Sequence, residues 1–141
     1  MLRFIVPSIT LLLALPLGVQ AASLKDFELD KMLDKVAKQS SVGTPRAIND
    51  DILDQGYTVS GKELINHLSV RESHAVKMRA NPDAVRFQLG KSVCLNNGYR
   101  QLLAKGAVMR YDFTEYKTNR PVTTERFTAA DCGMTNPPKK K

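Results

Sequence analysis

The sequence predicts an α+β fold, in which an antiparallel sheet made from two β-hairpins carries helices mainly on one face. Apolar residues recur at helical spacing near residues 29–36 and again near residues 95–103, whereas they alternate with polar residues in two separate stretches. The expected order of elements is α-β-β-α-α-(α)-β-β. Because strands joined by short connections usually pair with each other, two hairpins side by side are the economical arrangement.

The first predicted helix follows Ser23, which with Asp26 has the form of a capping box. Turn-forming residues at 40–45 predict that this helix ends near Gln39. Its apolar residues share one face, at positions i, i+3, i+4 and i+7: Leu29, Met32, Leu33 and Val36.

The first hairpin joins 57–59 to 64–68 through a turn at 60–62, and Gly56 indicates a bulge in its first arm. The second joins 107–116 to 122–127 through a turn at 117–121. Between the hairpins, a capping box at 69–72 predicts a helix to about Ala80, and Asn81 begins another that runs to about Gly90. A third apolar helical stripe lies at 95–103, with Gly106 placed to end it. Whether residues 96–98 break that helix stays open.

Residues 1–21 have the three parts of a secretory signal. One positive charge, on Arg3, precedes an apolar run at 4–19, and small residues follow. The run contains Pro7, Pro16 and Gly18 and is shorter than the roughly 20 residues of a membrane-spanning helix, which disfavours the alternative of a retained anchor. We therefore expect a signal peptide at 1–21, a single domain at 22–132, and a secreted or periplasmic protein.

Cleavage is predicted between Ala21 and Ala22, because Val19 and Ala21 then occupy the positions three and one before the cut. Intact-mass measurement of the exported protein should give a chain that begins at Ala22. A cut one residue later would put Gln20 three residues before the cut, where a small residue is preferred. A membrane-retained species that still carries residues 1–21 would contradict this prediction.

Loss of Arg3 lowers the formal net charge from +7 by one, to +6, and Lys139, Lys140 and Lys141 supply half of that excess. The segment 133–141 has little to bury and is expected to be a disordered basic tail. The other charges are interspersed, so we expect no specific nucleic-acid binding. After cleavage no stable membrane anchoring is expected. The oligomeric state is left open.

Two cysteines, Cys94 and Cys132, follow the predicted signal. An even number of cysteines in an exported chain favours a disulfide over free thiols, and no spacing typical of a metal site is present. Closing the loop from residue 94 to residue 132 corresponds to about 3.9 kcal/mol in the chain-entropy model.

The sequence assigns no catalytic residue, metal ligand or cofactor. His67 and His74 are the only histidines and fall on different predicted elements. Asp50, Asp51 and Asp54 lack the spacing of a calcium loop and are interpreted as solvated charges. The charged residues of the second hairpin are expected to pair across its strands: Arg110, Asp112, Glu125 and Arg126.

Four stretches of the chain carry a resemblance: 23–29 (SLKDFEL), 41–49 (SVGTPRAIN), 64–71 (LINHLSVR) and 113–120 (FTEYKTNR). Together they resemble the quorum-sensing-regulated virulence factor family, small secreted proteins of pseudomonads. The resemblance implies secretion, an α+β fold and expression controlled by population density. It names no site.

Two functions are compatible with these observations. The leading hypothesis is a secreted or periplasmic protein that binds a protein or envelope partner without catalysis. The alternative is a small secreted hydrolase or other enzyme with a site near His67 and His74. A buried polar pocket that joins the histidines to nearby carboxylates would favour the enzyme, whereas a continuous exposed apolar or aromatic patch would favour binding.

Overall fold

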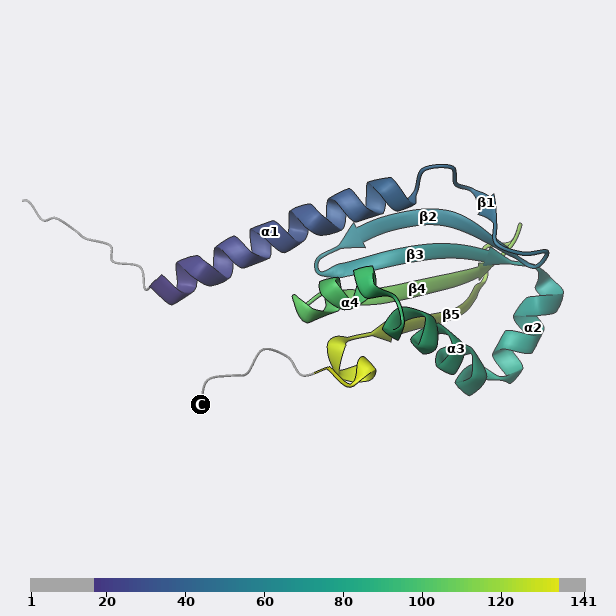
Figure 1. Cartoon of the computed structure of the whole chain (residues 1–141). Helices are drawn as coiled ribbons and strands as arrows, with labels where there is room; N and C mark the ends of the chain where they lie inside the picture. The colour runs from purple at the N-terminus through teal and green to yellow at the C-terminus, as the bar shows by residue number, and fades with distance from the viewer. Residues whose placement is uncertain (1–16, 135–141) are drawn as a thin grey trace, which may run out of the picture.

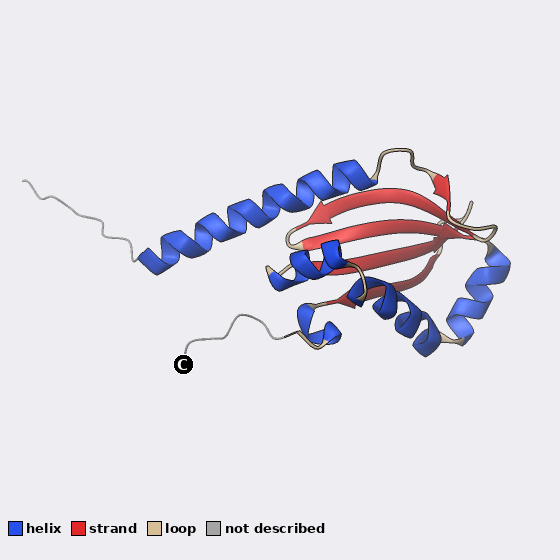
Figure 2. Cartoon of the chain, viewed as in Figure 1, coloured by secondary structure: helices blue, strands red, loops and turns tan. Residues whose placement is uncertain are grey.

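The computed structural model describes residues 17–134, with side chains from Leu24 onward. It has α+β architecture, as predicted: a five-stranded sheet in the order β1-β2-β3-β4-β5, with helices against one face (Figures 1 and 2). The elements are α1 (Leu17–Ser40), β1 (Arg46–Ala47), β2 (Ile52–Ser60), β3 (Glu63–Val70), α2 (Glu72–Ala80), α3 (Pro82–Cys94), α4 (Asn97–Ala104), β4 (Val108–Glu115), β5 (Pro121–Phe127) and the short 3-10 helix η1 (Ala129–Cys132).

The predicted apolar stripe of α1 packs on the sheet. Leu29, Leu33 and Ala37 are buried there, with Met32 and Val36 half-buried beside them. The helix ends at Ser40, one residue after the predicted position.

The predicted start of α1 at Ser23 is wrong for the full chain, because the helix already begins at Leu17. Residues 17–22 contain no proline, and Gly18 alone among them strongly disfavours a helix, so the helix continues through them. The predicted cut after Ala21 would therefore fall within the helical segment.

The first hairpin is confirmed, with β2 and β3 antiparallel around a turn at Gly61. Gly56 forms the predicted bulge, where the register shifts and the backbone adopts φ +109°. The carboxylate of Asp54 sits behind this bulge and accepts hydrogen bonds from the Gly56 N–H (2.9 Å) and from Asn66 Nδ2 (3.0 Å). Asp54 is buried, so its interpretation as a solvated charge is wrong. Its carboxylate accepts a hydrogen bond from a backbone N–H group that the bulge leaves without a partner in the β-ladder.

The second hairpin is also confirmed, but the two hairpins meet through a parallel pair, β3 with β4. The sheet is therefore mixed, and the prediction of an entirely antiparallel sheet is wrong for this one pair of strands. The reason is the length of the connection: residues 71–107 fold as α2, α3 and α4 and return the chain to the same end of the sheet, which is the crossover that a parallel pair requires. The short strand β1 was not predicted and pairs with the outer edge of β2.

Two predicted boundaries in the helical connection are wrong. Ser69 does not cap α2, because the alternation of β3 continues through Val70 and Arg71 takes the cap position. Gly90 does not end α3, which runs on to Cys94. A Cβ at residue 90 would lie 3.1 Å from the Phe127 ring, so this glycine serves the close approach of helix and strand.

The remaining helix boundaries agree with the prediction. Asn81 precedes α3 with Pro82 at its first position. The open question at residues 96–98 is resolved as a break, because the Asn96 side chain accepts the Tyr99 N–H (2.9 Å) and starts α4. Gly106 ends α4 with φ +103°, and its N–H bonds the carbonyl of Leu103.

The core lies between the helices and one face of the sheet. The strand residues on this face alternate along each strand as predicted and are buried: Leu64, Leu68, Val70, Met109, Tyr111, Phe113 and Phe127. They meet buried residues of every helix: Leu29 and Leu33 of α1, Ala75 and Met78 of α2, Val93 of α3, and Leu102 and Leu103 of α4. The predicted disordered tail lies outside the described residues, apart from Gly133 and Met134.

Glu115, at the end of β4, is a buried carboxylate. It accepts hydrogen bonds from Arg120 (3.0 Å) and Arg79 (2.7 Å), and these two guanidinium groups hold its pKa at about 2, against an ordinary value of 4.5. The pair of arginines ties α2 and the β4–β5 turn to the end of the sheet.

A depressed pKa in the folded state means that Glu115 contributes stability above its ordinary pKa and loses that contribution as the pH falls toward 2. Glu115→Gln should therefore be less stable than wild type at neutral pH, and the difference should shrink between pH 4.5 and pH 2. Urea unfolding across this range measures it. A difference that stays constant with pH would show that the charge on Glu115 is not responsible.

Candidate binding groove

The two histidines do not form a common site. His67 lies on the outer face of β3, away from the helices, and its Nε2 is 2.7 Å from Thr58 Oγ1. His74 lies on α2, where its Nδ1 is 3.8 Å from a carboxylate oxygen of Asp51. Each histidine thus has its own partner on a different element, and the enzyme alternative gains no support from their placement.

The outer face of the sheet carries a closed network of ion pairs. Glu63 accepts hydrogen bonds from Arg110 (2.9 Å) and Arg126 (2.8 Å), which lie directly opposite each other on β4 and β5. Arg110 also binds both oxygens of Asp112 (2.9 and 2.8 Å). The Arg110 and Arg126 guanidinium groups hold the pKa of Glu63 below its usual range. The predicted pairing between β4 and β5 is not present for these residues. Arg110 and Arg126 face each other with like charges, and both pair instead with Glu63 of β3, while Asp112 pairs with Arg110 on its own strand.

Glu125 points to the opposite face, where it belongs to a second cluster around Arg86 of α3. Arg86 donates to Glu125 Oε1 (3.0 Å) and to the carbonyl of Arg126 (3.1 Å), and it forms an ion pair with Asp131 (3.4 Å). Its guanidinium also lies over the Phe127 ring, 4.4 Å from the centroid. One arginine thereby joins α3, β5 and η1.

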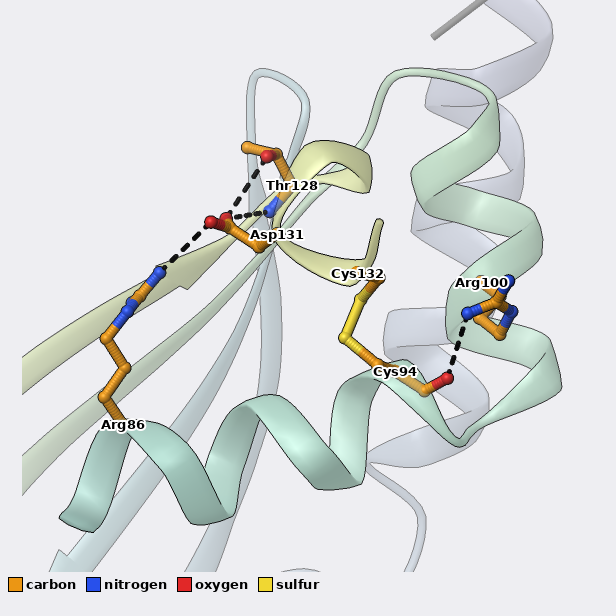
Figure 3. The surroundings of a disulfide bond; sticks show 6 residues. All are labelled: Arg86, Cys94, Arg100, Thr128, Asp131 and Cys132. Carbon is orange, nitrogen blue, oxygen red and sulfur yellow. Dashed lines mark hydrogen bonds and ion pairs between the residues drawn. A yellow bond between two sulfur atoms is a disulfide. The ribbon is translucent and has the colours of Figure 1, made fainter. Parts of the chain in front are cut away.

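The disulfide expected from the sequence joins Cys94, the last residue of α3, to Cys132, the last residue of η1 (Figure 3). The two Cα atoms are 5.3 Å apart. Next to it, Thr128 and Asp131 form a capping box that holds η1, and Arg100 donates to the carbonyl of Cys94 (3.1 Å). The chain after β5 is thus fastened to α3 through Asp131 and Cys132, the last two residues of η1.

A groove runs between α3 and η1, and the disulfide lies in its wall. Its lining residues come from α3, β5 and η1: Arg86, Phe87, Gly90, Lys91, Cys94, Phe127, Asp131 and Cys132. Gly90 keeps the helix close to the Phe127 ring, while the Arg86 ion pairs and the disulfide fix the walls. The groove is therefore largely preformed, which is typical of binding sites.

Two large apolar side chains are exposed next to this groove. Phe87 lines it and is 68% exposed, and Leu95, directly after Cys94, is 74% exposed. Single exposed apolar residues also occur elsewhere on this protein, for example Phe27 and Tyr116, so it is the combination of exposed apolar side chains with a preformed groove that distinguishes this place. We call the groove together with Phe87 and Leu95 the α3–η1 groove.

Sequence reasoning missed this site because its walls come from residues about forty positions apart. One local signal was available: within the predicted helix, Phe87 lies among polar residues, off the face that carries Val85 and Leu89. A large apolar residue off the buried stripe indicates a surface with another use.

The described residues contain no group of three or more histidine, cysteine or acidic side chains that could hold a metal ion. Between residues 17 and 134, no helix is both long and apolar enough to cross a membrane.

Residues 22–133 match the family described as "Putative quorum-sensing-regulated virulence factor". The chain belongs to this family. The match covers the whole predicted domain, so the resemblance seen in the four sequence stretches is confirmed. No curated protein matches the sequence.

One solved structure is similar to this chain in both sequence and fold. It is the crystal structure of a "putative secreted protein" of Pseudomonas aeruginosa, 76% identical, with a TM-score of 0.75, covering 77% of this chain and 96% of that one. The family member described here is accordingly a secreted or periplasmic protein, as the sequence predicts.

Two more distant structures share the fold. One is the pilotin EpsS of the Vibrio vulnificus type 2 secretion system, at 17% identity and a TM-score of 0.67, covering 78% of this chain and 96% of that one. The other is the type II secretion system pilotin AspS of Vibrio cholerae, at 17% identity and a TM-score of 0.63, covering 79% of this chain and 99% of that one. At this identity the similarity concerns the fold alone.

Proposed function

We propose that this family member acts in the cell envelope or outside the cell by binding a protein partner, without catalysis, and that the partner contacts the α3–η1 groove. The observation that carries the proposal is the exposure of Phe87 and Leu95 beside a groove whose walls are fixed by a disulfide and by Arg86. A groove with fixed walls loses little conformational entropy on binding, which favours recognition at such a place. The fold shared with two secretion-system pilotins is compatible with a partner-binding role.

The groove suits an apolar segment that carries a negative charge. Lys91 is exposed at its rim, while Arg86 is already paired with Glu125 and Asp131. A partner would therefore cover Phe87 and Leu95 and place a carboxylate near Lys91.

Affinity capture from envelope extracts and from host-cell extracts tests this proposal. The mature protein, Phe87→Ser with Leu95→Ser, and a control with two changes on the outer sheet face, Thr58→Ser with Thr124→Ser, are used as bait. We expect one protein that wild type and the control retain and the groove variant loses. A protein that all three baits retain equally would contradict the assignment to this groove.

A further inference from the structure

Six charged residues of α1 fall into two rows, while Lys25 and Glu28 lie outside them. Asp26, Asp30 and Asp34 are spaced by four residues and form one row along the helix. The β2–β3 turn neutralises part of this row, because Lys62 Nζ is 3.1 Å from Asp30 and 3.5 Å from Asp26. The acidic flank of α1 is therefore turned toward the sheet.

The second row is basic. Lys31, Lys35 and Lys38 lie at positions i, i+4 and i+7, on the side of α1 opposite the buried stripe, and all three are exposed. Two apolar side chains continue this side toward the N-terminus: Leu24, 62% exposed, and Phe27, 58% exposed. The Lys31 ammonium lies 5.0 Å from the centroid of the Phe27 ring. We call these five residues the α1 outer stripe.

We propose that the α1 outer stripe binds the surface of an anionic phospholipid membrane reversibly. Lysine, phenylalanine and leucine are common in helices that lie at a membrane surface, and the α1 outer stripe exposes all three. The N-terminal part of α1 projects beyond the sheet (Figure 1), which leaves this end of the helix accessible.

The expected strength of membrane binding can be estimated from the contributions of the three lysines and of Phe27. Each lysine close to an anionic membrane strengthens binding about fivefold, so the three lysines together contribute about 100-fold. Phe27 adds roughly tenfold when its ring leaves water. Such binding is reversible and depends on salt. It is independent of the proposed protein partner, because the α3–η1 groove lies on the β5 side of the molecule and α1 on the β2 side (Figure 1).

Sedimentation with vesicles tests the proposal on the mature chain with its complete C-terminus. Vesicles of equal parts phosphatidylglycerol and phosphatidylcholine are compared with vesicles of phosphatidylcholine alone. The stripe variant is Lys31→Gln, Lys35→Gln and Lys38→Gln, and the control removes the same charge from other parts of the chain: Arg71→Gln, Lys77→Gln and Lys117→Gln.

We expect wild type to bind the anionic vesicles, the stripe variant to lose about 100-fold in its partition coefficient, and the control to lose less than fivefold. Phe27→Ser alone should lose roughly tenfold. Equal losses in the stripe variant and the control would overturn the proposal, because net charge alone would then explain binding. Binding of an acidic helical peptide to the stripe in the absence of vesicle binding would also overturn it, in favour of a protein at this face. Thermal melting of every variant checks that the fold is retained.

Discussion

Replacing both Cys94 and Cys132 by alanine should lower the free energy of unfolding by about 2–5 kcal/mol. The disulfide closes the loop that contains α4, β4 and β5, so its loss gives the unfolded chain more conformational freedom. It also releases the end of η1 from α3, where the Arg86–Asp131 ion pair and the Thr128 capping box remain. Urea unfolding of the double variant, compared with oxidised wild type, gives the difference.

Reduced wild type serves as the control for this measurement, because it lacks the bond but keeps both side chains. We expect it to unfold at nearly the same urea concentration as the double variant. A double variant that is as stable as oxidised wild type would show that the packing of η1, rather than the covalent bond, fixes the α3–η1 groove.

Leu33→Ala should destabilise the protein by about 2–5 kcal/mol, since Leu33 has no exposed surface and lies in the core between α1 and the sheet. Leu24→Ala on the same helix is a matched control, because Leu24 is 62% exposed and the same change should alter stability by less than about 0.5 kcal/mol. Denaturant unfolding of both variants measures this contrast. If Leu33→Ala were as mild as Leu24→Ala, α1 would be an appendage of the domain rather than part of its core.

The sequence was most informative where structure depends on neighbouring residues. Both hairpins, the bulge at Gly56 and the end of α4 at Gly106 follow from local turn chemistry and from alternation along single strands. Ser69 shows the limit of this reasoning. It has the spacing of a helix cap, but the alternation of β3 includes it, and burial in the sheet decides its conformation.

Features that depend on distant residues could not be predicted. The parallel pairing of β3 with β4 depends on how three helices return the chain, and nothing local to either strand specifies it. Gly90 was expected to end a helix because its contact with Phe127 is not visible in the sequence. The α3–η1 groove could not be predicted for the same reason, because Arg86 and Asp131 come together only in the folded chain.

Site-specific photo-crosslinking in living cells tests most directly the central claim, that this secreted or periplasmic protein binds a partner through the α3–η1 groove. A photoreactive phenylalanine analogue is placed at Phe87 in one strain and at Thr124, on the outer sheet face, in another. Both positions are exposed, so the two strains differ in the face that is probed. We predict a discrete crosslinked protein from position 87 that is absent from position 124 and that disappears when Leu95 is changed to Ser. Crosslinks of the same size from both positions, or none from position 87, would contradict the claim.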